Sequence, residues 1–328
     1  MIQNKKLLEN TKNLLAFSAG VDSTALFFLL LENHIKFDIA IVDYGMREQS
    51  KEEVAYAKEL AKKYKLKCFV FDAEPIASNF EANARKIRYN FFEELIKKQH
   101  YETLLTAHHL GDRFEWMLMQ FCKGAGCVEL SGMKSIQKRE GYTLIRPLLH
   151  LEKQELLEYL HLHAYKYFVD ASNSDAKYKR NEFRHNYAQP LLKKYLSGIK
   201  KSFEYMDEDV NSLTHEVEIQ SSNEFIYFQS TGSRLSDVQI IDKYFKSKEH
   251  LITANERKEL KEQKSVLISR RFIVNQEHGY IFIAPYITDI TIPKKLKEKF
   301  RLLKITPKLR GYLASDAEAV ALVSLLLQ

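Results

Sequence analysis

The sequence predicts an α/β protein: a doubly wound parallel sheet in the first half of the chain and a smaller α+β domain at the C-terminal end. Three observations support this fold class. Short apolar runs alternate with stretches of helical length through the first half, and this alternation stops near residue 146. The chain has 328 residues, of which 45% are hydrophobic and 28% charged, which is typical of a folded protein with two domains.

Repeated strand–helix units are the reason to expect a parallel sheet with helices on both faces. Such a sheet binds ligands beyond the carboxyl ends of its strands, so polar residues that follow different strands should converge there. These residues lie at 18–23, 43–47 and 108–115. The expected strands are 13–17, 39–43, 68–71 and 103–107, and the expected helices are 22–32, 51–64, 80–99 and 112–122.

The remaining elements place a domain boundary near residue 206. We expect a first domain over 1–205, which includes a helical extension, and a smaller second domain over 206–328. The hairpin expected in the second domain turns at Glu277-His278-Gly279. The other predicted elements are helices at 152–162, 181–195, 197–218, 254–263 and 315–327, and a hairpin over 266–284.

The turn Ser18–Ser23 joins the first strand to the first long helix of the predicted sheet. Its residues are small and polar, and several backbone N–H groups point to the same place as the positive end of the helix dipole. Such a turn suits a phosphate or a pyrophosphate. It is neither a P-loop, because no Gly-Lys-Ser/Thr follows, nor a dinucleotide fingerprint, because Gly-x-Gly-x-x-Gly is absent.

Charge and cysteine content narrow the class of protein further. The net charge is +7 and the pI about 9.0, and residues 177–201 and 294–310 each hold eight Lys or Arg against one Glu. These windows are either solvated faces or contacts to a polyanion such as RNA. Three cysteines without a Cys-x-x-Cys pair fit a reducing cytoplasm, and we expect neither a membrane span nor a signal peptide.

Further motifs follow the turn in a fixed order, and together they resemble one family. Over about residues 13–192 the chain is similar to the tRNA(Ile)-lysidine synthases, a branch of the PP-loop ATP-pyrophosphatases, whose loop reads Ser-Gly-Gly-x-Asp-Ser. The motifs are Val42–Ser50, Asn83–Tyr89, Thr106–Glu115, Gly124–Gly126, Leu130–Met133, Arg146–Leu149, Asp170–Asn173 and Arg180–His185.

The resemblance implies a ligase that forms a carbon–nitrogen bond, with the catalytic PP-loop domain over 1–205 and a tRNA-associated domain over 206–328. ATP, with Mg²⁺, adenylates the 2-keto oxygen of the wobble cytidine in the CAU anticodon of a tRNA(Ile). Free L-lysine then displaces AMP through its ε-amine, which gives lysidine, AMP and pyrophosphate. The chemistry fits, because a ring carbonyl becomes a good electrophile only when its oxygen carries a leaving group. The sequence leaves open which residues bind the metal and whether the enzyme is a homodimer.

The same resemblance assigns roles to residues. Asp112 and Glu115 are three apart at a helix start, so they face the same side and would seat the lysine ammonium; the alternative is an ordinary helix cap with a first-turn acid. One of these carboxylates or His108 would accept the amine proton. The ATP-binding set is Ser18, Ala19, Gly20, Val21, Asp22 and Ser23; the catalytic set is Asp43, Arg47, His108, Asp112 and Glu115; the tRNA-binding set is Arg180, Arg184 and His185.

Several of these residues keep a second interpretation. Asp43 is a nucleotide or metal contact or a turn-capping aspartate, and the arginines at 180 and 184 bind the anticodon loop or lie on a solvated helix face. Arg85 is an alternative to Arg47 for stabilising charge on phosphate. We expect His109 to be structural.

Three positions depart from the family pattern. Ala19 lies where glycine is usual, Tyr44 where histidine is usual and Gly111 where aspartate is usual. Because alanine with positive φ is strained by about 1–2 kcal/mol, we expect residue 19 to be right-handed or extended. Two other functions stay open: thiolation of tRNA by a related PP-loop enzyme, which needs cysteine chemistry, and a non-catalytic module that binds RNA or nucleotides.

Overall fold

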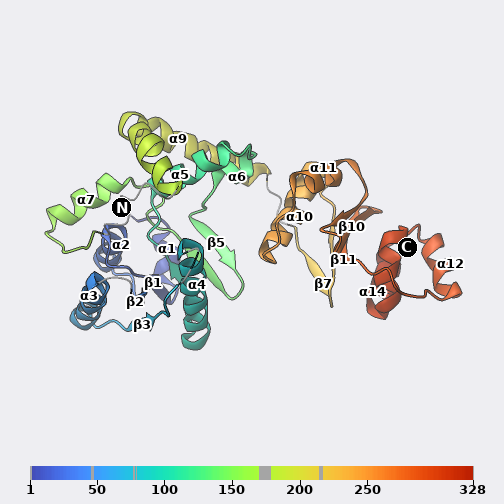
Figure 1. The fold of residues 1–328 in the computed structure, drawn as a ribbon, viewed down its shortest axis with the longest axis horizontal. Helices are drawn as coiled ribbons and strands as arrows, with labels where there is room; N and C mark the ends of the chain where they lie inside the picture. Colours follow the sequence, from blue (N-terminus) through green and yellow to red (C-terminus); the bar gives the residue numbers. More distant parts are fainter. Residues whose placement is uncertain are drawn as a thin grey trace. The chain divides into compact units, whose positions relative to one another are not determined.

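A six-stranded sheet forms the centre of the first of two units, Met1–Asp207 (Figure 1). The computed structural model describes residues 2–45, 48–76, 78, 80–169, 179–213 and 217–327. The strand order is β3-β2-β1-β4-β6-β5; the first five are parallel, and β5 pairs antiparallel with β6 at the edge. The strands are β1 (Asn13–Ala16), β2 (Phe37–Asp43), β3 (Cys68–Asp72), β4 (Thr103–Leu105), β5 (Ile136–Arg139) and β6 (Tyr142–Ile145).

Helices cover both faces of this sheet, which confirms the predicted fold class. Because side chains alternate along a strand, Leu15 and Leu105 face α2, α3 and α7, whereas their neighbours Leu14 and Leu104 face α4. The helices that begin in this unit are α1 (Lys5–Glu9), α2 (Val21–Glu32), α3 (Glu48–Tyr64), α4 (Phe80–Gln99), α5 (Leu110–Phe121), α6 (Cys127–Ser131), α7 (Lys153–Leu162), α8 (Lys179–Phe183) and α9 (Gln189–Leu213), whose last turns belong to the second unit.

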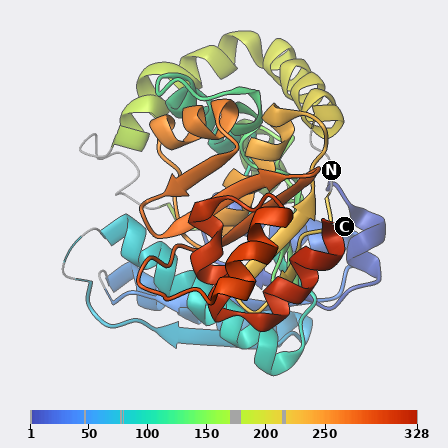
Figure 2. The same cartoon turned by 90° about the vertical axis from the view of Figure 1, so that its right-hand side faces the viewer.

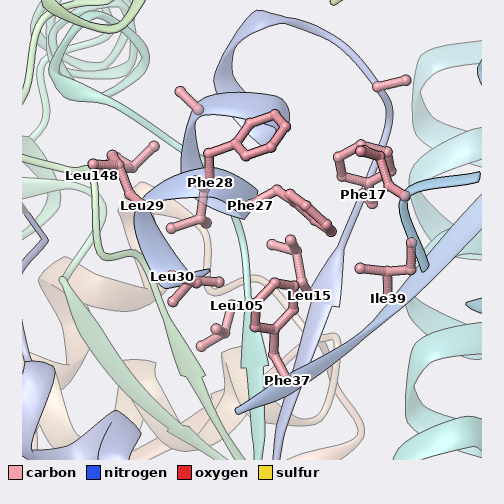
Figure 3. Packing of buried hydrophobic residues seen from close by; sticks show 14 of the residues in the cluster. Leu15, Phe17, Phe27, Phe28, Leu29, Leu30, Phe37, Ile39, Leu105 and Leu148 are labelled. Carbon is pink, nitrogen blue, oxygen red and sulfur yellow. The ribbon is translucent and has the colours of Figure 1, made fainter. Parts of the chain in front are cut away.

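An aromatic cluster holds α2, the helix that follows the loop at residues 18–23, against the sheet. Phe27 of α2 is fully buried and points toward the sheet (Figure 3). Its ring centroid lies 5.2–5.8 Å from the rings of Phe17, Phe28, Phe37 and Tyr64. Edge-to-face and tilted pairs of this kind add to the burial of apolar surface. They fix α2, and with it the loop 18–23, on the sheet.

The region after β4 differs from the predicted elements. The hairpin β5–β6 was not expected, because its edge strand is exposed along its whole length and carries no apolar period. The helix expected at 181–195 is instead α8, a π-helical turn over Arg184–Ala188 and the start of α9, which is non-helical at Tyr195. α9 also includes most of the expected connecting helix.

A buried contact fixes this helical region on α5. Leu110 and Phe114 of α5 pack against Ala188, Leu192 and Phe203. Beside them, the guanidinium of Arg113 donates two hydrogen bonds to the Asp207 carboxylate and one to the Ser131 carbonyl. This packing determines which residues of the segment after residue 178 face the start of α5.

The second unit, Glu208–Gln328, contains a five-stranded antiparallel sheet between two helical layers. Helices α10 and α11 pack on one face, and α12, α13 and α14 pack on the other (Figures 1 and 2). The hairpin turn at 277–279 lies as expected, with positive φ at His278 and Gly279, although the hairpin is part of a three-stranded meander. The elements are β7 (Gln220–Ser222), β8 (Phe225–Gln229), α10 (Arg234–Ser247), α11 (Ala254–Glu262), β9 (Ser265–Ile268), β10 (Phe272–Glu277), β11 (Tyr280–Pro285), α12 (Lys294–Leu302), α13 (Pro307–Ser315) and α14 (Ala317–Leu326).

No helix in the described parts of either unit is both long and apolar enough to cross a membrane. The role predicted for the second unit in tRNA binding stays a prediction.

Candidate active site

The loop between β1 and α2 has the form that an anion site requires. Gly20 precedes the first residue of α2 with extended backbone, and no side chain caps the helix. The Ser23 hydroxyl accepts a hydrogen bond from the Ser18 N–H at 3.2 Å, and the two serine hydroxyls lie 3.0 Å apart. The N–H groups in the first turn of α2 therefore point to one place without a side-chain acceptor, and the helix dipole favours negative charge there.

The expectation for Ala19 was wrong, because its φ is +56° and its backbone is left-handed. The chain must reverse between the end of β1 and the start of α2, and the left-handed residue makes this reversal while Gly20 stays extended (φ −74°, ψ 172°). The Ala19 carbonyl accepts a hydrogen bond from the Phe168 N–H at 2.9 Å, which holds the bend in place. Position 19 is therefore the one that favours glycine, as in the usual family loop.

Replacing Ala19 by glycine should change the free energy of unfolding by less than about 1 kcal/mol. The substitution relieves about 1–2 kcal/mol of left-handed strain, which offsets the lost methyl burial and the greater freedom of glycine in the unfolded chain. Urea unfolding followed by the fluorescence of Trp116, the only tryptophan, measures the change. Ala25→Gly, at an equally buried helical position of α2, is the matched control and should destabilise by about 1–2 kcal/mol. An equal loss for both variants would contradict the strain argument.

A capping box begins α5 after the fourth strand. The Asp112 carboxylate accepts the backbone N–H of His109 at 3.0 Å, and Nδ1 of His109 accepts the N–H of Gly111 at 3.0 Å. His109 is thus structural in part, as expected. Gly111 fits the cap, since a Cβ at this position would lie 2.7 Å from the His109 ring. The aspartate usual in the family would need that ring to move.

The proton of neutral His109 is left on Nε2, because its Nδ1 is an acceptor. Nε2 lies 3.8 Å from Oδ2 of Asp22 and 3.6 Å from Oδ2 of Asp112, so one imidazole joins the loop after β1 to the helix after β4. The other Asp22 oxygen, Oδ1, is buried and has no hydrogen-bond partner among the described residues. Burial raises the pKa of Asp22, although the charge of Lys153 opposes this.

Two carboxylates and two arginines form a compact cluster at the start of α5. Glu115 is 3% exposed and accepts hydrogen bonds from Nε of Arg180 at 3.1 Å and from Nε and Nη2 of Arg184 at 2.6 and 3.1 Å. Oδ1 of Asp112 accepts from Nη2 of Arg180 at 2.7 Å. Burial opposes ionisation of Asp112, but the charge of Arg180 and the hydrogen bond from the His109 N–H lower its pKa well below the usual range. The solvated-face interpretation of Arg180 and Arg184 was therefore wrong.

His108 is held neutral at the same edge of the sheet. Its Nδ1 lies 2.9 Å from the Thr106 hydroxyl. Burial, followed by the positive charges of Arg146, Arg85 and Arg180, lowers the pKa of His108 to about 3, against the opposite effect of Asp112. A neutral imidazole can accept a proton or a hydrogen bond but does not provide positive charge.

His108→Gln should flatten the pH dependence of stability between about pH 6.5 and pH 4. The unfolded histidine binds a proton below about pH 6.5 while the native one stays neutral, so acidification costs the wild type up to about 1.4 kcal/mol per pH unit. Urea unfolding at several pH values, followed by Trp116 fluorescence, measures the slope. His161→Gln, on an exposed histidine, should leave it unchanged. Parallel slopes for wild type and His108→Gln would show that His108 titrates normally.

Asp43 and His185 form hydrogen bonds with residues near them in the chain, and other predicted site residues are not described. Asp43 ends β2, and its carboxylate accepts the Gly45 N–H at 2.8 Å, which is the turn-capping alternative. His185 is exposed on the π-helical turn, with Nδ1 3.1 Å from Oε1 of Gln189. Arg47 and the motif Asp170–Asn173 lie outside the described residues, so their roles stay predictions.

Sequence reasoning missed that Arg180 and Arg184 bind Asp112 and Glu115. One signal was present: the two arginines are four residues apart, as are side chains on one helix face. The partner residues lie about 70 positions earlier in the chain, and no local pattern connects them.

Comparisons with known proteins agree with the fold of the first unit. Residues 1–191 match the PP-loop domain family. The U34-tRNA thiolase NcsA from Methanococcus maripaludis, solved with its 4Fe–4S cluster, has a TM-score of 0.52 at 19% identity; the similarity covers 65% of this chain and 76% of that one and supports the fold alone. The parallel sheet, the open start of α2 and the domain match define a PP-loop protein.

Relatives that match over nearly their whole length show to which branch of the PP-loop proteins the chain belongs. Proteins named tRNA(Ile)-lysidine synthase are 43% identical in Wolinella succinogenes, over 95% of both chains, and 41% identical in Helicobacter pylori, over 94% of this chain and 91% of the relative. The Campylobacter jejuni relative of the same name is 39% identical over 94% of both chains. The chain belongs to the tRNA(Ile)-lysidine synthase family.

Proposed function

We propose that this protein uses ATP to join L-lysine to the wobble cytidine of the CAU anticodon of tRNA(Ile), through an adenylated cytidine. The observation that carries the proposal is the joining of two segments at one sheet edge. Through His109, the anion-binding loop at residue 20 meets the acidic start of α5. An activated nucleotide and a cationic nucleophile need such neighbouring sites.

The loop at residues 18–23 would bind the ATP phosphates. The N–H groups at the start of α2 and the Ser18 hydroxyl would donate to phosphate oxygens. Asp22 fits Mg²⁺, because Oδ1 is a buried carboxylate oxygen without a partner. The described residues hold no group of three or more His, Cys, Asp or Glu suited to a metal, so the ion would take its other ligands from phosphate and water. The ion would offset phosphate charge.

Asp112 and Glu115 would seat the lysine side chain. The two carboxylates are the acidic groups of the cluster, and both are already bound by Arg180 and Arg184. A lysine ammonium must therefore share or replace an arginine hydrogen bond. The ε-amine attacks only when neutral, and His108 or one of the carboxylates would accept its proton. A neutral His108 with depressed basicity would hold that proton only briefly.

A transfer assay tests the proposal. The protein is incubated with tRNA(Ile) transcript, ATP and labelled lysine, and the label on tRNA, AMP and pyrophosphate are measured. We expect all three products in equal amounts and none without ATP. Sulfur incorporation in place of lysine would indicate a thiolase, and binding of ATP and tRNA without AMP release would indicate a non-catalytic module.

A further inference from the structure

Two arginines lie over the ring of Tyr89, and a third, buried arginine lies within electrostatic reach of them. The guanidinium carbon of Arg85, on α4, lies over the Tyr89 ring at 4.9 Å from its centroid. That of Arg139, on the edge strand β5, lies over the same ring at 5.2 Å. Both arginines are exposed. A guanidinium that covers an aromatic ring uses its face, so its N–H edge stays available for hydrogen bonds.

The third arginine, Arg146, directly follows β6 and is 4% exposed. It donates from Nη1 to the Lys134 carbonyl at 2.7 Å and from Nη2 to Oε1 of Gln137 at 3.2 Å, both neutral acceptors. Its Nε and the Tyr89 hydroxyl are buried and have no hydrogen-bond partner within the described ranges. Burial and the charges of Arg139 and Arg85 lower the pKa of Arg146, with the tyrosines opposing. A buried cation without a counter-charge is unfavourable unless an anion approaches.

The protein does not provide that anion among its described residues. None of the three arginines forms an ion pair there, in contrast to Arg180 and Arg184. Glu93 lies one turn of α4 after Tyr89, but its carboxylate accepts the Tyr142 hydroxyl at 2.9 Å. The cluster thus combines three positive charges with an aromatic ring, and no acidic residue in the described parts of the chain forms an ion pair with it.

The cluster adjoins the proposed site through the sheet. Leu105 of β4 pairs with Ile145 of β6, so His108 and Arg146 both follow the carboxyl ends of adjacent parallel strands. The positive charges of Arg146 and Arg85 act on His108, which places them within electrostatic reach of that imidazole.

We propose that Arg85, Arg139 and Tyr89, supported by Arg146, bind a backbone phosphate of the RNA strand that delivers its base to His108. Single-stranded RNA is bound by cations interleaved with aromatic rings, and the bidentate edge of a guanidinium matches a phosphate. Base and phosphate belong to one nucleotide, so a base in the site brings a phosphate to its border. The inference rests on the proposed tRNA substrate. Pyrophosphate has the same chemistry and is the competing source of the anion.

The test compares Arg139→Gln with Lys138→Gln. The two residues are neighbours on the exposed strand β5 and lose the same charge, but successive strand residues point to opposite faces, so only Arg139 contacts Tyr89. Dissociation constants for the tRNA(Ile) transcript are measured at several salt concentrations, together with inhibition by pyrophosphate and the KM for ATP. Thermal unfolding of each variant checks the fold.

Arg139→Gln should weaken tRNA binding about fivefold and reduce the salt slope by about 1, while Lys138→Gln, the KM for ATP and pyrophosphate inhibition stay unchanged. Arg139→Lys should restore the salt slope because it restores the charge. Two outcomes would overturn the proposal. Weaker pyrophosphate inhibition with unchanged tRNA affinity would assign the cluster to the leaving group. Equal losses of tRNA affinity for Arg139→Gln and Lys138→Gln would mean that only the general surface charge matters.

Lysine transfer by the wild type, measured in parallel, separates this inference from the proposed function. A wild type that transfers no lysine but needs Arg139 for tRNA binding would refute the ligase function and keep the RNA contact. A wild type that transfers lysine while Arg139→Gln binds tRNA normally would refute the contact and keep the ligase function.

Discussion

Glu115→Gln should destabilise the first unit by about 3 kcal/mol, the largest effect on stability that we expect from a single change in the site. Glu115 is 3% exposed and accepts three hydrogen bonds from the guanidinium groups of Arg180 and Arg184. A glutamine keeps the volume but removes the charge and one acceptor, so two partly buried cations lose their main partner. Urea unfolding followed by Trp116 fluorescence measures the loss, since Trp116 is the next residue on α5.

Glu94→Gln is the control for Glu115→Gln, because Glu94 is an exposed acid on α4. It should change the free energy of unfolding by less than about 0.5 kcal/mol. A loss below about 1 kcal/mol for Glu115→Gln would mean that the arginines find other partners and that the cluster does not hold α8 and the π-helical turn against α5.

Asp112→Asn should raise the KM for lysine about 50- to 100-fold and change the KM for ATP by less than about threefold. The asparagine oxygen can still accept the His109 N–H, so the cap of α5 is kept while the negative charge is lost. A hydrogen bond between charged groups contributes about 2–3 kcal/mol, which corresponds to that change in KM. Initial rates of labelled lysine transfer, with lysine and ATP varied in turn, measure both constants.

The control for this change is again Glu94→Gln, which should leave both constants unchanged. A rise in the KM for ATP as large as that for lysine would contradict the lysine role. It would place Asp112 on the nucleotide side of the site, where His109 joins it to Asp22. The assignment of the two substrates to the two segments thus depends on this ratio.

Most of the parallel sheet could be predicted, because its strands are short apolar runs and the stretches between them are long enough to form helices. The hairpin β5–β6 could not be, since β5 is an edge strand with four exposed residues and no apolar face to detect. The single helix predicted at 181–195 was wrong because the π-helical turn within it is stabilised by packing of Ala188 and Leu192 on α5, and not by local propensity.

In the site, groups of residues that are neighbours in the sequence could be predicted, whereas contacts between distant segments could not. Ser18–Ser23 and His108–Glu115 are local motifs, and their positions follow from the strands that precede them. The prediction for Ala19 was wrong because the strain of a left-handed alanine is a local quantity. The hydrogen bond from the Phe168 N–H, which holds the bend, comes from a distant segment.

Apolar spacing and the chemistry of turns and caps act within a few residues. The alternation of strands and helices, the small polar residues after the first strand and the two acids at the start of α5 can therefore be read from the sequence alone. Which charges meet depends on the folded chain: Arg180 and Arg184 bind Glu115, whereas Arg85, Arg139 and Arg146 have no acidic partner among the described residues. Ion pairing depends on distance in space, and packing over tens of residues sets that distance.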